Sequence, residues 1–255
     1  MEMKGMMGGL YRICEWIMRF SVINILWVLC SIPIFYFLIV LLHSQTLDQF
    51  VFTLMIMGVL SPFTLFPATS AMFAVARKWV MGEEDVPLFK TFFRSYKENY
   101  VKSMFGGIIF TFLIVLMIVN YRFYAAQESA LQFLSVVFIA FLLVVFISMF
   151  HFFSIVVHLE MKTLQVVKNA ILITLGRPLT SVLITITNLF ILYISFYHFT
   201  FLIPFFMGSL IAYMTFFHFH RLFLKIKKKQ EEYEAELGES EEKKNGENVV
   251  ATSKD

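Results

Sequence analysis

The chain has 255 residues, of which 59% are hydrophobic and 15% are charged, and its formal net charge at pH 7 is +3. Soluble domains carry about 45–50% apolar and about 25% charged residues, so this chain has too few polar side chains to cover a folded surface in water. The composition excludes an ordinary soluble domain, and the small net charge gives no sign of a nucleic-acid-binding protein. We expect an all-α, polytopic membrane protein.

The N-terminal region predicts an interface helix followed by a membrane span. Apolar residues recur at helical spacing over residues 6–19, with charged residues between them, which is typical of a helix lying on a membrane surface. Residues 20–42 then run without a charge and are long enough to cross the membrane. A signal peptide is the alternative interpretation, but the apolar run is too long and no small-residue cleavage site follows it.

Five further spans are expected from the remaining uncharged runs. Residues 178–220 contain no Asp, Glu, Lys or Arg over 43 positions, which is too long for one span and fits two with a tight turn between them. Pro62 and Pro67 predict a kink in the second span, because proline interrupts a helix without preventing it from crossing a membrane. The five spans are expected at about residues 50–76, 103–121, 131–157, 179–197 and 200–220.

Two more amphipathic segments, residues 86–102 and 162–177, are expected to form cytoplasmic helices that connect the spans. Together with residues 6–19 they precede three helical hairpins at intervals of about 80 residues. This spacing indicates either an internal repeat or the general likeness of amphipathic connectors. The six-span membrane domain covers residues 1–224, and residues 225–255 form a charged cytoplasmic tail that we expect to be largely disordered.

The distribution of lysine and arginine predicts the orientation of these spans. If the N-terminus is cytoplasmic and the chain crosses six times, 20 of the 21 cations fall in cytoplasmic segments, and only Arg122 falls outside. Cytoplasmic segments of membrane proteins carry an excess of Lys and Arg. We therefore expect both termini in the cytoplasm.

The sequence predicts neither an enzyme nor a cofactor or metal site. It contains no H-E-x-x-H, no G-x-S-x-G and no P-loop motif. His151 and His158 lie seven residues apart, and His218 and His220 end the last span, so a metal site at one membrane level is the alternative. Residues two apart on a helix face different ways, which favours polar anchors at the interface.

Polar residues are scarce in the predicted spans. Asn24 and Asn188 are the main candidates for intramembrane polar contacts, and such residues more often bond a neighbouring helix than line a transport path. Pairs of small residues, such as Gly208 and Ala212, predict close helix contacts within one chain or between two copies. The oligomeric state stays open.

The central loop between the second and third spans is the best candidate for a functional surface. Its cations are suited to docking a cytoplasmic partner or an anionic lipid, and the alternative is that they serve only to set topology. They are Arg77, Lys78, Lys90, Arg94, Lys97 and Lys102.

Four stretches of the chain resemble the YesL-like family of bacterial integral membrane proteins, a group defined by a domain of unknown function. They read LYRICEWIMRF from residue 10, FPATSAMFAVARKW from residue 66, G-E-x-D-x-P-x-F-K-x-F-F over residues 82–93, and HLEMKTLQVVKNAILIT from residue 158. The likeness covers roughly residues 1–225 and leaves out the acidic tail.

This resemblance implies an accessory membrane component associated with carbohydrate ABC importers and with sensor-regulator systems, and it implies no catalytic or binding residue. An accessory role at the plasma membrane, with ABC importer or sensor-kinase components as partners, is therefore the leading expectation. A small-solute transporter or permease component is the alternative.

Overall fold

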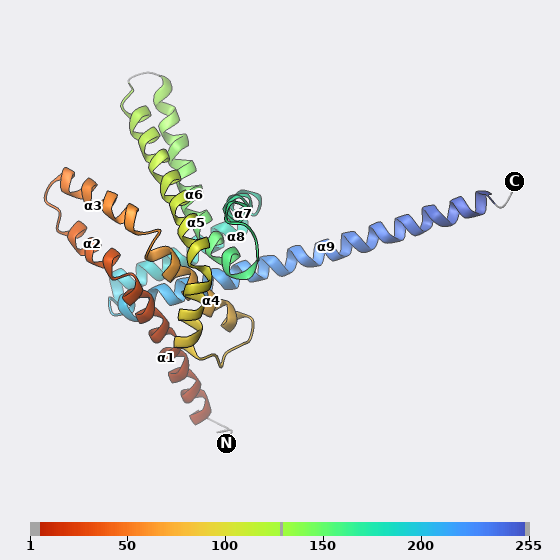
Figure 1. The fold of residues 1–255 in the computed structure, drawn as a ribbon, viewed down its shortest axis with the longest axis horizontal. Coiled ribbons are helices and arrows are strands. Elements are labelled where there is room, and N and C mark those ends of the chain that lie inside the picture. The colour runs from red at the N-terminus through yellow and green to blue at the C-terminus, as the bar shows by residue number, and fades with distance from the viewer. Residues whose placement is uncertain (1–5, 128–129, 253–255) are drawn as a thin grey trace.

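The computed structural model describes residues 6–127 and 130–252, and the side chains of residues 8–127 and 131–236. This part of the chain is helical and contains no strand. Three hairpins splay in different directions from a shared centre: α2 with α3, α5 with α6, and α8 with the start of α9 (Figure 1). The helices are α1 (Met6–Cys30), α2 (Ile32–Leu42), α3 (Leu47–Leu60), α4 (Leu65–Val80), α5 (Leu88–Ala125), α6 (Phe133–His158), α7 (Thr163–Gly176), α8 (Pro178–Tyr193) and α9 (Gly208–Thr252), with the short turns η1 (Ala130–Gln132), η2 (Ile194–His198) and η3 (Ile203–Met207).

The predicted interface helix and first span are not separate elements in the structure. α1 continues through both, and the rest of the predicted span 20–42 is α2, which begins after Ser31. Pro33 lies in the first turn of α2, where its missing N–H leaves no bond unmade, whereas its ring blocks continuation of α1. The helix that is long and apolar enough to cross a membrane therefore begins at Gly8 and not at residue 20.

The second predicted span is broken near Pro62, as its sequence indicates. α3 and α4 meet at a bend of 55° across residues 61–64. Pro67 lies inside the first turn of α4, a position that tolerates proline because the N–H there has no partner within the helix. Only one of the two prolines therefore marks a break.

α5 joins two elements that the sequence treats separately. The amphipathic segment 86–102 and the span 103–121 form one helix of 38 residues. At 1.5 Å per residue this helix is about 57 Å long, almost twice the ~30 Å hydrocarbon core of a bilayer. Its N-terminal half, which carries Lys90, Arg94 and Lys97, therefore extends beyond any membrane that its C-terminal half crosses.

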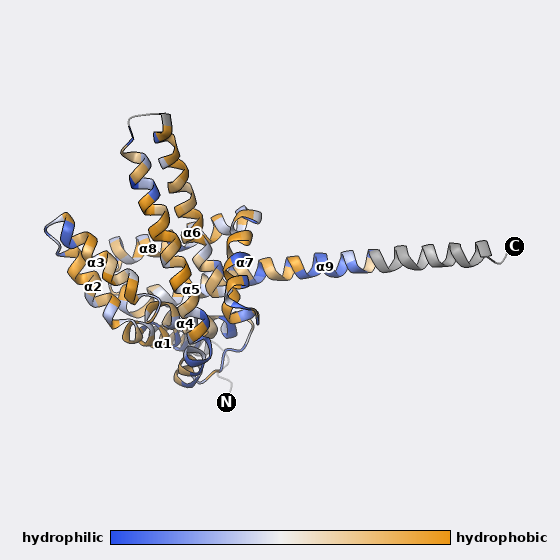
Figure 2. Ribbon diagram, turned by 45° about the horizontal axis from the view of Figure 1, so that its top comes forward, coloured by the Kyte–Doolittle hydropathy of each residue, from blue (hydrophilic) through white to orange (hydrophobic). Residues whose placement is uncertain are grey.

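Four helices in the described part of the chain are long and apolar enough to cross a membrane, and α3 with α4 makes a fifth if the bent pair counts as one span. Hydrophobic residues predominate along α2, α3, α5, α6 and α8 (Figure 2). The sixth predicted span, 200–220, is divided between η3 and the start of α9. The protein is thus a multi-pass membrane protein, and the count of six spans and the orientation of the termini stay predictions.

The tail of the chain is helical in the structure, where the sequence predicts disorder. α9 runs on to Thr252 and projects away from the hairpins (Figure 1). Its side chains from Lys227 to Glu236 are exposed, so strong helix formers and pairs one turn apart, such as Lys227–Glu231 at 3.6 Å, support this helix. The side chains of residues 237–255 lie outside those that the structure describes.

The core lies where α4, α5 and α6 meet. Phe66, Phe110, Phe152 and Phe153 stack there with ring centroids 5.2–6.4 Å apart. These rings come close to the α5 backbone because Gly106 and Gly107 have no side chain, and both glycines are buried. The packed core fixes the N-terminal half of α5 against α4 and the end of α6.

Candidate functional site

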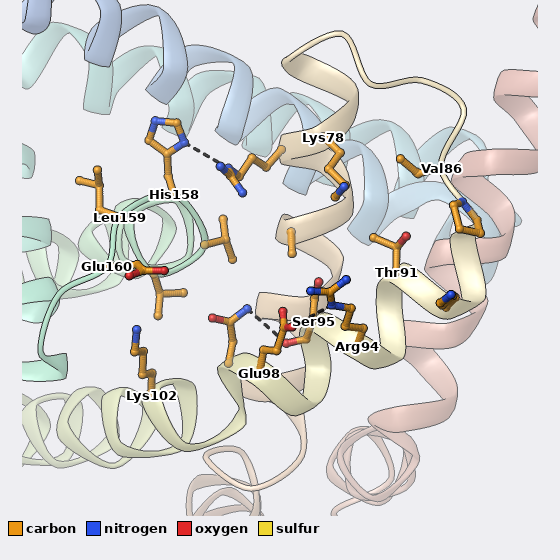
Figure 3. Close-up of a pocket in the computed structure, with 17 residues that line it drawn as sticks. Lys78, Val86, Thr91, Arg94, Ser95, Glu98, Lys102, His158, Leu159 and Glu160 are labelled. Atoms are coloured by element: carbon orange, nitrogen blue, oxygen red, sulfur yellow. Dashed lines mark hydrogen bonds and ion pairs between the residues drawn. The ribbon is translucent and has the colours of Figure 1, made fainter.

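A cleft of about 760 Å³ opens beside this core, between the end of α4, the N-terminal half of α5 and the end of α6. Five of the six central-loop cations line it, and the sixth, Lys97, does not. Residues 158–160, at the C-terminal end of the core helix α6 and just after it, form its far wall (Figure 3). The cleft therefore joins two segments of the chain that are about 80 residues apart in sequence.

The cations fall into two groups by exposure. Lys90, Arg94 and Lys97 are exposed and follow one another at positions i, i+4 and i+7, so they form a stripe along one side of α5. Arg77, Lys78 and Lys102 are half-buried and line the interior of the cleft. We call these two groups the outer stripe and the inner cations.

Uncharged donors complete the interior of the cleft. Thr91 and Ser95 are buried on the inner side of α5, and Asn99 lies one turn further along. Arg77 donates from Nε to Nδ1 of His158 at 3.2 Å, and this bond holds the guanidinium at the C-terminal end of α6. The other two guanidinium nitrogens remain free to bind a ligand. The interior thus offers hydroxyl, amide and guanidinium donors together.

Two carboxylates, Glu98 and Glu160, also line the cleft. Arg94 donates to Glu98 at 2.8 Å, so this acid is neutralised by the outer stripe. Glu160 is exposed at the far wall and has no ion pair within 4 Å among the side chains that the structure describes. With five cations against two acids, the cleft is positive.

The apolar side of the N-terminal half of α5 is only partly as the sequence predicts. Leu88, Phe92 and Tyr96 are buried or half-buried, and they belong to or pack against the core. Val101 belongs to the same predicted amphipathic segment but is 58% exposed. Val101 follows Tyr96 by five residues, which places its side chain about 140° around the helix axis from that of Tyr96.

An ion cluster that sequence reasoning did not find attaches the central loop to α1. Arg19 donates to Glu15 at 2.5 Å and to Asp85 at 2.6 Å, and its guanidinium lies 5.3 Å from the ring of Trp16. The Arg19 side chain is 6% exposed, whereas that of Asp85 is 94% exposed, because Asp85 reaches it with one oxygen from the surface. The sequence shows the charges of this cluster, in the acidic turn after Gly82 and in the N-terminal part of α1, but it does not show that they pair.

The same loop is also tied to α4. Lys78 donates to Glu83 at 2.9 Å, and this hydrogen bond, with the charge of Lys78, lowers the pKa of the Glu83 carboxyl from its usual value. Gly82 turns the chain between them with φ of +92°, a conformation that residues with a side chain rarely adopt. Lys78, one of the inner cations, is therefore partly neutralised by its own loop.

The two asparagines singled out in the sequence make contacts between helices. Asn24 is fully buried; its Nδ2 donates to the carbonyls of Ile203 and Pro204, and its Oδ1 accepts from the backbone N–H of Ser209. Asn188 exchanges hydrogen bonds with the hydroxyl of Thr215. Both asparagines stabilise the third hairpin and lie outside the cleft.

Three of the histidines form hydrogen bonds with polar side chains of other helices. Among the residues that the structure describes, no three side chains of His, Cys, Asp or Glu lie close enough together to hold a metal ion. His151 bonds Ser181 at 3.1 Å, His158 accepts from Arg77, and His218 lies 3.3 Å from Thr187. Each of the three has a polar partner on another helix.

The sequence of this chain is similar to a family and to proteins whose function is not known. Residues 47–121, from α3 to the end of the third predicted span, match the family described as "Protein of unknown function, DUF624". No solved structure matches the chain.

Three proteins of Bacillus subtilis (strain 168) are similar over most of the chain. The uncharacterized protein YteU is 31% identical over 216 residues, 84% of this chain and 84% of that protein. YesL is 29% identical over 80% of this chain and 85% of its own length, and YesV is 32% identical over 78% and 83%. The matched residues 47–121 include all six cations of the central loop.

Proposed function

This chain belongs to the YesL-like family, whose members carry the DUF624 domain of unknown function, and we propose that it is a non-enzymatic accessory protein of the bacterial cell membrane. It crosses the membrane six times with both termini in the cytoplasm. It acts through its cytoplasmic face on a carbohydrate ABC importer or on a sensor-kinase system. The observation that carries this proposal is the outer stripe, Lys90, Arg94 and Lys97, which stands exposed on the part of α5 that extends beyond the membrane.

Six crossings are compatible with the broken helices. Membrane proteins tolerate breaks where the freed backbone groups find partners inside the protein. Asn24 supplies such partners at η3, which divides the sixth predicted span. In this topology 20 of the 21 cations lie inside, together with the cleft and the tail.

Cysteine labelling tests the topology. In a variant without Cys14 and Cys30, single cysteines at Gln45, Gln127 and Thr200 are expected to react with an impermeant thiol reagent in intact cells. Cysteines at Glu83 and Tyr233 are expected to react only after lysis. Labelling of the Glu83 position from outside contradicts six crossings with cytoplasmic termini.

The outer stripe is the proposed docking surface for an acidic segment of the partner. Replacing Lys90, Arg94 and Lys97 by glutamine keeps good helix formers in place and leaves 17 of the 20 inside cations, so folding and topology are expected to hold. The triple variant is expected to lose the partner that the wild-type protein retains on purification from native membranes. Quantitative mass spectrometry of the purified material measures this loss.

The tail provides a matched control for this experiment. Replacing Lys227, Lys228 and Lys229 by glutamine removes the same charge from exposed positions of α9, and it is expected to leave the partner bound. Docking through the outer stripe is wrong if the α5 variant keeps every partner of the wild-type protein, or if both triple variants lose them equally.

A further inference from the structure

The inner cations have no role in this docking, because they are half-buried between α4, α5 and α6. A protein surface that docks through exposed charges does not need a cavity of about 760 Å³ behind them. This volume lies within the ~300–1,000 Å³ range of small-ligand sites. The cleft therefore has the size of a binding site for a small molecule.

We propose that this cleft binds a phosphate ester, with its phosphate group held by Arg77, Lys78 and Lys102. Arginine fits the geometry of phosphate oxygens, and the Nε–H of Arg77 is already engaged by His158, which fixes the plane of the guanidinium. Lys102 has no ion pair within 4 Å among the described side chains. These two cations are therefore available to a ligand, whereas Lys78 shares its charge with Glu83.

The remaining lining fits the organic part of such an ester. Thr91, Ser95 and Asn99 present hydroxyl and amide groups, while Ala74, Val156 and Val157 form an apolar wall. The polar groups suit a phosphate ester of a small polar alcohol, and the apolar wall suits one whose alcohol carries acyl chains. The ester is either a soluble metabolite or a membrane lipid with a phosphate headgroup, since both offer the same group to the cations.

Glu160 acts as a selectivity element in this site. It lies on the far wall of the cleft (Figure 3) and is exposed. A carboxylate facing the site repels any anion, so binding requires that the attraction of the three cations outweigh this repulsion. That net attraction grows with the negative charge of the ligand. A phosphate monoester, with up to two charges, meets this requirement better than a carboxylic acid.

Glycerol 3-phosphate is a suitable soluble probe, because phosphatidic acid presents the same group in a lipid. Full-length protein purified in maltoside detergent is titrated by calorimetry with glycerol 3-phosphate, with glycerol and sodium chloride at matched ionic strength as controls. Retention of phosphatidic acid against phosphatidylcholine is measured in parallel by native mass spectrometry. Saturable binding of glycerol 3-phosphate indicates a soluble ligand, and selective retention of phosphatidic acid alone indicates a lipid headgroup.

Matched variants on one helix test the site itself. Lys102→Gln is expected to weaken binding of whichever probe binds by at least fivefold. Lys97→Gln, which removes the same charge from the outside of α5, is expected to change it less than twofold. Glu160→Gln is expected to tighten binding. If Lys102→Gln does not fold, the affinity of Glu160→Gln for the same probe tests the site in its place. The proposal is overturned if neither probe binds saturably, if Lys97→Gln weakens binding as much as Lys102→Gln, or if Glu160→Gln fails to tighten it.

Discussion

Replacing Gly106 by alanine is expected to destabilise the protein by about 2–3 kcal/mol, because the core has no room for a methyl group there. A Cβ atom at this position lies 2.1 Å from Cζ of Phe152 and 2.5 Å from its Cε2. Phe152 cannot move aside easily, since its ring is fully buried against Phe66, Phe110 and Phe153. Thermal unfolding in detergent, followed by circular dichroism, measures the effect.

Gly58→Ala is the matched control, because the nearest atom to its new Cβ is Cγ2 of Thr111 at 3.6 Å, an ordinary contact. It is expected to keep or slightly raise the melting temperature, since alanine favours helix over glycine. Phe152→Leu combined with Gly106→Ala is expected to recover part of the loss, because leucine removes the ring carbon that the methyl group meets. Equal melting temperatures for Gly106→Ala and the wild-type protein contradict the packing described for α5 and α6.

The sequence predicted which residues are helical better than where each helix begins and ends. Uncharged runs locate the apolar helices because a membrane-spanning segment must be apolar along its length. Helix boundaries depend on backbone bonds, and these are set by single residues. Pro33 ends α1 in the middle of a predicted span, and nothing ends α5 at residue 102, so one predicted span is divided and another is fused with its connector.

The cleft was predicted in part. Composition and the positive-inside pattern drew attention to the central loop, and five of its six cations do lie together. His158 and Glu160 could not be assigned to the same site, because only the packing of α6 against α4 and α5 brings them there. Arg19 was taken as a topology signal, although it binds the acidic turn of the loop; pairing between residues 66 positions apart has no local signature.

The η3 turn explains why an asparagine lies in α1 at a fully buried position. η3 is a π-helical turn that contains Pro204, and this geometry leaves backbone groups of the third hairpin without partners inside the helix. The side chain of Asn24 meets two carbonyls, at 3.1 Å for Ile203 and 2.7 Å for Pro204, and one N–H, at 3.1 Å for Ser209. α1 therefore stabilises the break between η2 and α9.

Asn24→Leu is expected to cost about 2–4 kcal/mol, because Asn24 is fully buried and the change removes its three hydrogen bonds to the backbone of the third hairpin, including the one from the buried N–H of Ser209. Asn24→Asp is nearly the same size and is expected to be at least as harmful, since a carboxylate cannot donate to either carbonyl. Melting temperatures in detergent measure both effects. Both changes are expected to weaken the contact of α1 with the third hairpin. The turn of that hairpin is then held less firmly, so protease cleavage in residues 199–202 is expected to become faster.

The pair Asn188 and Thr215 provides the contrast that tests this explanation. These two side chains bond each other and no backbone group, at 3.0 and 3.3 Å. Replacing both at once, Asn188→Leu with Thr215→Val, leaves no polar group unpaired and is expected to cost less than about 1 kcal/mol. If Asn24→Leu is as mild as this double replacement, the backbone of η3 finds other partners, and Asn24 does not hold the third hairpin to α1.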